Sequence, residues 1–163
     1  MYIDKNDLIW NSISGLFQPK EFGIEHGGKV RRLLVESLLN VRAIWNKPLI
    51  VLAGLATTGH ANKSYHYAAP PVREGADAVD FIIPAVPFSD VFVRLINFKD
   101  IYGIGLYYNW RYKGEATPGF HIDTRPNGLL WYRDQAGQYH YNPDGKTLIR
   151  VLQMGDAIRY TGG

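Results

Sequence analysis

Ala78-Val79-Asp80-Phe81 and Gly119-Phe120-His121-Ile122-Asp123 are two apolar runs, and ionisable side chains interrupt each of them. Short apolar runs bounded by turn residues predict buried strands. Residues 103–108 (Gly-Ile-Gly-Leu-Tyr-Tyr) predict a third strand, which neighbours the second one across a polar connection. An unpaired ionisable group inside a sheet is costly, so Asp80 and His121 are expected to have a partner in the fold.

Helical segments surround these strands in the sequence. Apolar residues recur at helical spacing from residue 30 to residue 45, while charged residues fill the opposite side, which predicts an amphipathic helix. Pro48 ends this helix, and residues 49–53 predict a short buried strand. A second helix is predicted over residues 89–96. The mixture favours an α+β fold, in which helices flank a mostly antiparallel central sheet.

The composition predicts a single domain over residues 1–163. Of these residues, 46% are hydrophobic and 13% aromatic, so the chain can bury one sizeable core. Aromatic and polar residues alternate in the last part of the chain around Pro143-Asp144-Gly145, which predicts a C-terminal β extension over residues 132–163. No apolar stretch is long enough to span a bilayer, so we expect no membrane partner.

Charge and cysteine content narrow the function further. The formal net charge is +3, and Lys and Arg are spread along the chain without a dense cluster, which argues against a nucleic-acid partner. The chain has no cysteine, so any metal must be held by imidazole and carboxylate groups. Residues 1–7 lack a basic region followed by a long apolar run, so no signal peptide is expected there.

His66, Asp80 and His121 match the ligand set of a catalytic zinc site, with one position left for water. Taken singly, each has an ordinary explanation, as a loop histidine, a strand-end turn former or a hydrogen-bonded residue of a sheet. The combination favours zinc as a cofactor. His60 and Asp77 are alternative ligands, because His60 shares a loop with His66 and Asp77 precedes the strand of Asp80.

A series of short motifs runs through the chain in a specific order. Its residues are Ser64 and His66, Ala78 and Asp80, Gly103, Gly105 and Tyr107, and then Phe120, His121 and Asp123. This series resembles the zinc D-Ala-D-Ala carboxypeptidases and phage endolysin peptidases, which share a fold with Hedgehog signalling domains. The resemblance covers roughly residues 15–131.

The resemblance implies a zinc metallopeptidase, a hydrolase that cleaves peptide bonds in bacterial peptidoglycan as a D,D-carboxypeptidase or an endopeptidase. Its partner would be a peptide stem or cross-link, and the protein would act as a monomer. With no signal peptide expected, it would stay in the cytoplasm until its release as a phage lysin, or it would be carried by the virion. An alternative is a catalytically inactive module of the same fold that binds the cell wall or builds a phage structure.

The general base does not follow directly from the resemblance. Relatives place an acidic residue or a second histidine shortly before the last zinc histidine, where this chain has Pro118 and Gly119. Glu115 in the preceding loop and Asp123, on the same strand face as His121, are therefore the candidate catalytic residues. Asp123 has a second interpretation, in which it orients a zinc-binding imidazole.

Substrate binding also departs from the family pattern. The family often has Ser-Gly-Tyr-Arg where this chain has Ala53-Gly54-Leu55-Ala56, so the arginine that helps to hold the substrate is missing. Arg73 and Arg125 flank the predicted metal and can replace that arginine, and the motif residue Ser64 completes the predicted substrate-binding set. Residues 67–75 lengthen the usual distance between the first two ligands, and we expect them to form a rim or lid over the cleft.

Overall fold

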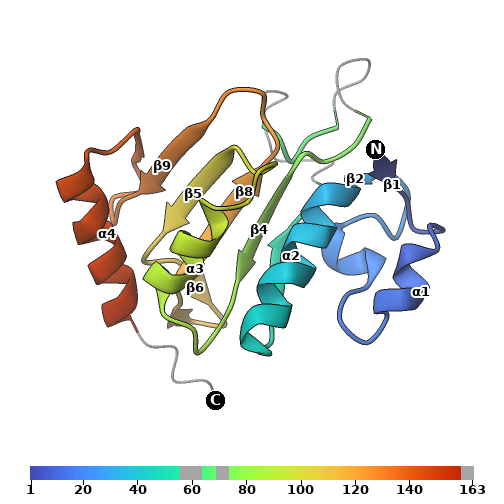
Figure 1. Ribbon diagram of the computed structural model, residues 1–163, viewed down its shortest axis with the longest axis horizontal. Coiled ribbons are helices and arrows are strands. Elements are labelled where there is room, and N and C mark those ends of the chain that lie inside the picture. The colour runs from blue at the N-terminus through green and yellow to red at the C-terminus, as the bar shows by residue number, and fades with distance from the viewer. Residues whose placement is uncertain (56–63, 69–73, 159–163) are drawn as a thin grey trace.

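The computed structural model of the chain describes residues 1–55, 64–68 and 74–158 (Figure 1). Its helices are α1 (Ile9–Ile13), α2 (Arg32–Trp45), α3 (Phe88–Leu95) and α4 (Gly145–Ala157), with a 3₁₀ turn η1 (Pro19–Phe22). Its strands are β1 (Tyr2–Ile3), β2 (Val30–Arg31), β3 (Ile50–Ala53), β4 (Ala78–Ile82), β5 (Gly103–Tyr107), β6 (Arg111–Tyr112), β7 (Glu115–Ala116), β8 (Gly119–Asp123), β9 (Leu129–Arg133) and β10 (Tyr139–Tyr141). The chain therefore has the predicted α+β fold.

Six strands form the central sheet in the order β10-β9-β5-β8-β4-β3. Neighbouring strands run antiparallel except for β5 and β9, which are parallel. Two pairs of short strands, β1 with β2 and β6 with β7, form small sheets of their own. The prediction of a mostly antiparallel central sheet flanked by helices is confirmed.

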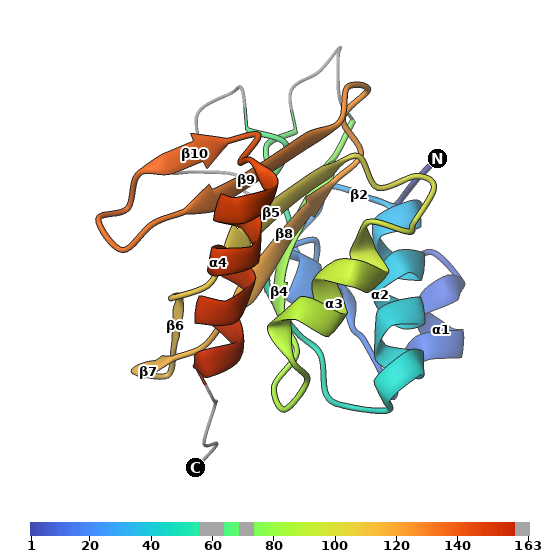
Figure 2. The same cartoon turned by 60° about the vertical axis from the view of Figure 1, so that its left-hand side comes forward.

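Helices α2, α3 and α4 lie over one face of this sheet, as the two views in Figures 1 and 2 show. On that face the ring of Phe120 in β8 stacks on Phe81 of β4 at 5.6 Å and on Phe88 of α3 at 4.4 Å. Gly155 of α4 packs against the ring of Phe88, so the two helices approach closely. The apolar core therefore lies between the helices and this face.

Helix α2 confirms the predicted amphipathic helix. Leu34, Leu38 and Val41 recur at the spacing of one helix face, and all three are fully buried. The helix ends at Asn46, which adopts the left-handed conformation (φ 47°) and donates its N–H to the carbonyl of Arg42 at 3.0 Å. Within the described ranges, neither α2 nor any other helix has the length and apolar character needed to cross a membrane.

The opposite face of the sheet carries ionisable side chains. Because side chains alternate along a strand, Asp80 and His121 point away from the helices that Phe81 and Phe120 contact. The antiparallel register of β4 and β8 places Asp80 directly opposite His121. On the other side of β8, Gly105 of β5 lies opposite the same histidine.

Two glycines of β5 make room on this face. A Cβ at Gly105 would collide with the indole ring of Trp131, and a Cβ at Gly103 would collide with the carboxylate of Asp123. Both side chains therefore lie directly on the backbone of β5. The missing Cβ atoms allow a bulky ring and a carboxylate to pack beside His121.

The C-terminal segment differs from the predicted β extension over residues 132–163. Strands β9 and β10 form a hairpin, but α4 follows, so the prediction was wrong for this part. Asp144 caps the helix, because its side chain accepts a hydrogen bond from the N–H of Thr147 at 2.7 Å. The apolar side chains of the helix that pack on the core are Leu148, Val151, Leu152 and Met154. The Asp-Gly pair that suggests a hairpin turn instead begins a helix.

Candidate metal centre

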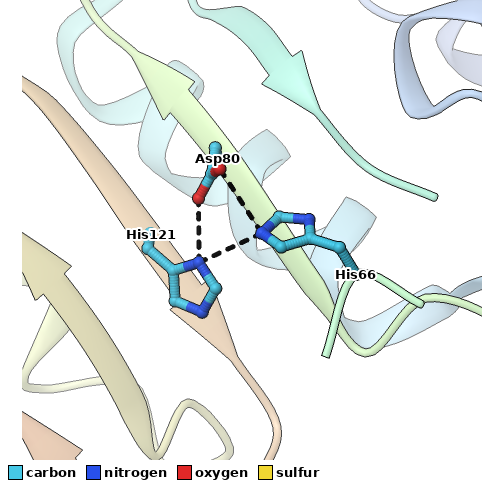
Figure 3. A group of neighbouring side chains, drawn as sticks. All are labelled: His66, Asp80 and His121. Carbon is cyan, nitrogen blue, oxygen red and sulfur yellow. Dashed lines mark hydrogen bonds and ion pairs between the residues drawn. The ribbon is translucent and has the colours of Figure 1, made fainter. Parts of the chain in front are cut away.

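His66, Asp80 and His121 converge on the sheet face opposite the helices (Figure 3). Asp80 comes from β4 and His121 from β8, while His66 reaches in from the segment of residues 64–68. Nε2 of His66 lies 3.2 Å from Nδ1 of His121 and 3.3 Å from Oδ2 of Asp80. Nδ1 of His121 lies 2.8 Å from Oδ1 of Asp80. All three residues are buried, and together they can hold a metal ion.

The ring of His66 is oriented by the backbone that follows β3. Its Nδ1 lies 2.9 Å from the carbonyl oxygen of Gly54, and because a carbonyl can only accept, Nδ1 carries the proton. In the neutral ring, Nε2 then presents its lone pair to Asp80 and His121. A side chain at residue 54 would not fit, since its Cβ would lie 2.5 Å from the carbonyl oxygen of Phe22.

The ring of His121 is oriented from behind by Asp123. Nε2 of His121 donates to Oδ2 of Asp123 at 2.9 Å, which leaves the lone pair of Nδ1 directed at Asp80 in the neutral ring. Asp123 is fully buried and also accepts a hydrogen bond from Nε of Arg125 at 2.7 Å. Its carboxylate lies on the far side of the ring from Asp80. This contact favours the orienting role for Asp123 over that of a general base.

The charges of the centre shift the pKa values of its groups. Burial alone would lower the pKa of His121, but hydrogen bonds with Asp123 and Asp80 outweigh it and raise the pKa to about 9. Burial would raise the pKa of Asp123, but Arg125 and His121 hold it at about 2. Burial opposes ionisation of Asp80 as well, and hydrogen bonds with the two histidines still hold its pKa well below the ordinary value. The centre therefore favours a positive charge between its two carboxylates.

The three converging groups need a cation between them, because all of them are hydrogen-bond acceptors. With His66 and His121 neutral and Asp80 ionised, the groups present only lone pairs to one another within 3.3 Å. Such an arrangement is stable only when a proton or a metal ion lies among the acceptors. A proton on His121 meets this need in the metal-free protein, and a metal ion can replace it.

The alternative ligand Asp77 serves another part of the fold. Its carboxylate accepts hydrogen bonds from the hydroxyl of Tyr2 at 2.9 Å and from Nε of Arg31 at 2.5 Å. These partners belong to β1 and β2, so the side chain is held at the N-terminal strand pair. His60 and most of residues 67–75, the predicted rim or lid, lie outside the described residues.

Glu115, the first candidate for the general base, is located in β7. It pairs with Tyr112 across the β6–β7 hairpin and is not one of the three side chains that converge. Pro118 lies in the short connection between this hairpin and β8, the strand that carries His121. The assignment of the base to Glu115 therefore stays a prediction.

Two of the three predicted substrate-binding residues, Arg125 and Ser64, are among the described residues. Arg125 forms an ion pair with Asp123, and its guanidinium lies 4.9 Å from the ring centre of Tyr65. Ser64 lies beside the centre, where its hydroxyl accepts a hydrogen bond from the backbone N–H of His66 at 3.3 Å. Arg73 lies outside the described residues. Arg125 therefore supports the metal centre through Asp123, which limits its availability to a substrate carboxylate.

Aromatic rings form a wall next to the centre, on the side of β5 and β9. The ring of Trp131 lies 5.3 Å from that of His121 and 5.2 Å from that of Tyr107, which in turn lies 4.3 Å from Trp110. The sequence shows a cluster of aromatic residues here without indicating which ones face the centre. Gly105 is the signal that could have identified Trp131, because the missing side chain opposite His121 leaves space for the indole.

No protein-family model matches the chain, and no curated protein or solved structure matches it either. The capacity to bind a metal ion is therefore inferred from the geometry of His66, Asp80 and His121 themselves.

The raised pKa of His121 predicts a pH-dependent stability of the metal-free protein. A group whose pKa rises from 6.5 to about 9 on folding stabilises the fold fully below pH 6.5, and this contribution is lost as the pH rises to 9. We expect the free energy of unfolding to fall by on the order of 1–3 kcal/mol over this range. Urea unfolding with a chelator present measures it, and His121→Asn should remove most of the slope. An equally stable wild-type protein at pH 6.5 and 9 would contradict the prediction.

Gly54→Ala is expected to weaken metal binding. The new methyl group would contact the backbone of Phe22 and displace the carbonyl that orients His66. Loss of such a partner typically lowers metal affinity by roughly 10- to 100-fold. Competition with a fluorescent chelator measures the affinity. Gly15→Ala is the matched control, because nothing lies within 4 Å of its Cβ position, and an equal effect in both variants would count against the prediction.

Proposed function

We propose that this protein is a zinc-dependent peptidase that cleaves peptide bonds in bacterial peptidoglycan. The observation that carries the proposal is the buried convergence of two imidazole lone pairs and one carboxylate. Such a set of two nitrogens and one oxygen is typical of catalytic zinc sites, which keep a fourth position open. The order of the motifs, which resembles that of D-Ala-D-Ala carboxypeptidases and endolysin peptidases, supports the substrate class.

The separations between the three groups are close to those around a tetrahedral ion. Around zinc with bonds of about 2.0 Å, ligand atoms lie roughly 3.3 Å apart. The two histidine nitrogens are 3.2 Å apart, and Nε2 of His66 lies 3.3 Å from Oδ2 of Asp80 while Nδ1 of His121 lies 2.8 Å from Oδ1. Binding through one carboxylate oxygen would therefore need a movement of the Asp80 side chain. Calcium and magnesium are less suitable, because both prefer six or more oxygen ligands.

The contacts of each residue support its role. His66, Asp80 and His121 would hold zinc, which when bound supplies a Lewis acid for the scissile carbonyl and the attacking water. Two neutral imidazoles and one carboxylate leave one net positive charge at a divalent ion, which favours an oxygen that gains negative charge. Asp123 and the carbonyl of Gly54 keep the two rings in the tautomers that binding requires.

Glu115→Gln is expected to lower turnover by roughly 100- to 10,000-fold, the usual effect of losing a general base. Zinc content should stay unchanged, because Glu115 is not among the three converging residues. Rates of peptide release and zinc per chain, measured on the same preparation, check both expectations. Full activity in this variant would assign the base to another residue.

The direct test combines metal analysis with product analysis. Purified protein is dialysed, its zinc is measured, and it is then incubated with peptidoglycan whose released fragments are identified by mass spectrometry. We expect zinc at one ion per chain, fragments cut within the peptide stems or cross-links, and loss of release after chelation that added zinc restores. Zinc binding without release would favour the inactive wall-binding or phage structural module. Protein that binds no zinc would overturn the proposal.

A further inference from the structure

A polar pocket of about 390 Å³ opens at one end of the aromatic wall. Its lining includes Tyr107, Trp110, Arg133 and the β9–β10 turn. Arg111, from the small β6–β7 hairpin, also contributes to its wall. Two arginines from separate parts of the fold, Arg133 of β9 and Arg111 of β6, therefore line the same pocket.

Both arginines have hydrogen-bonding capacity left for a ligand. Nη1 of Arg111 donates to the carbonyl of Gly114 at 2.9 Å, and Nε of Arg133 donates to the carbonyl of Gly137 at 3.3 Å. These partners are neutral, and in the described part of the chain neither arginine forms an ion pair with a carboxylate. A guanidinium has five N–H donors, so each retains donors for an anion.

The acidic residue of the pocket, Asp134, is already engaged by the turn. Its Oδ2 lies 2.7 Å from Nε2 of His140, and its Oδ1 accepts the backbone N–H of Gln138 at 2.9 Å. It therefore does not compete with a ligand for Arg111 or Arg133 through an ion pair. The pocket keeps an excess of positive charge.

The pocket lies along the same sheet face as the metal centre. In the register of β5 and β8, Tyr107 pairs with Gly119, two residues from His121, which corresponds to roughly 7 Å along the strand. Trp131 packs against both Tyr107 and His121, so the wall is continuous from the centre to the pocket. About two residues of an extended peptide span this distance.

We propose that Arg133 and Arg111 form a subsite that binds a carboxylate of the peptide held at the metal centre. The inference rests on the proposed peptidase function and specifies its substrate as an acidic peptide. Guanidinium groups bind carboxylates through paired, charge-assisted hydrogen bonds. Arg125, the arginine beside the metal centre, is paired with Asp123, whereas the hydrogen bonds of Arg111 and Arg133 within the described residues go only to backbone carbonyls.

The test compares two forms of one ligand. Zinc-loaded protein is titrated by calorimetry with the peptidoglycan tetrapeptide stem, which mass spectrometry must show to be intact after the titration, and with the same peptide amidated at every carboxylate. We expect amidation to weaken binding by roughly 10- to 100-fold in the wild-type protein. Arg133→Gln should remove most of this preference, Arg111→Gln part of it, and Arg133→Lys should retain a fraction, because the charge stays but the planar fork is lost.

Arg150→Gln is the matched control, because Arg150 is an exposed residue of α4 on the helix side of the sheet. It should keep the full preference. If Arg133→Gln and Arg111→Gln keep it too, the subsite is wrong even when the protein releases muropeptides. If the wild-type protein prefers the free carboxylates, loses this preference in Arg133→Gln and yet hydrolyses nothing, the subsite stands and the proposed peptidase function fails.

Discussion

His121→Ala is expected to abolish stoichiometric zinc binding and, with it, peptide release. His121 supplies one of the three converging atoms, 2.8 Å from Asp80 and 3.2 Å from His66. If four ligands share a binding free energy of about 10–16 kcal/mol, the loss of one costs about 3 kcal/mol, or roughly two orders of magnitude in affinity. Zinc per chain after dialysis against a weak chelator measures the effect.

His140→Ala provides the comparison for this variant. His140 also pairs with an aspartate, at 2.7 Å from Asp134, but the pair lies at the surface and outside the centre. Zinc content should match that of the wild-type protein. If His121→Ala retains tightly bound zinc at one ion per chain, the proposed ligand set is wrong.

Asp123→Ala is expected to weaken both metal binding and the fold. The carboxylate is fully buried and holds His121 and Arg125 together, so its removal leaves the partly buried guanidinium of Arg125 without its ion-pair partner. Breaking a fully buried pair costs about 3–5 kcal/mol of unfolding free energy, and because Arg125 is partly exposed we expect a loss of about 3 kcal/mol. Metal affinity should fall by roughly 10- to 100-fold, because His121 loses the group that fixes its ring. Urea unfolding and chelator competition measure the two effects.

Asp123→Asn distinguishes the effect of orienting His121 from the effect of the negative charge at residue 123. Its amide oxygen can still accept the N–H of His121, so this variant should lose less metal affinity than Asp123→Ala. Asp134→Asn removes an exposed Asp–His pair and should cost no more than about 1 kcal/mol. Comparable losses in Asp123→Ala and Asp134→Asn would show that the buried contact has no special role.

The central sheet and the pairing of Asp80 with His121 could be predicted because their signals are local. Short apolar runs specify β4 and β8, and an ionisable residue within such a run requires a partner. Asp80 and His121 each interrupt one of these runs, and antiparallel pairing then places them opposite each other. The distance between them in the sequence does not matter once both strands belong to one sheet.

The orientation of the two imidazoles could not be predicted in full. His66 is held by the carbonyl of Gly54, and a backbone carbonyl has no signature in a sequence. Arg125 was expected to bind substrate, whereas it pairs with the carboxylate two residues before it. Sequence alone does not distinguish an arginine that binds a ligand from one that satisfies a buried neighbour.

Helix α4 shows a different limit. Pro143-Asp144-Gly145 contains the residues of a hairpin turn, and the same residues can cap the start of a helix. The outcome depends on contacts far away in the sequence, such as the packing of Gly155 against Phe88 of α3. The local sequence is compatible with both a hairpin turn and the start of a helix, so tertiary packing determines which of them forms.

The convergence of His66 and His121 has a consequence for a chain that contains no cysteine. These residues are 55 positions apart, so an ion bound to both would cross-link the chain much as a disulfide does. Closing a loop of that length restricts the unfolded chain by about 4 kcal/mol in the chain-entropy model. Unlike a disulfide, this cross-link would be unaffected by reducing agents and would open with a chelator. Availability of the ion would then set the resistance of the protein to proteases as well as its activity.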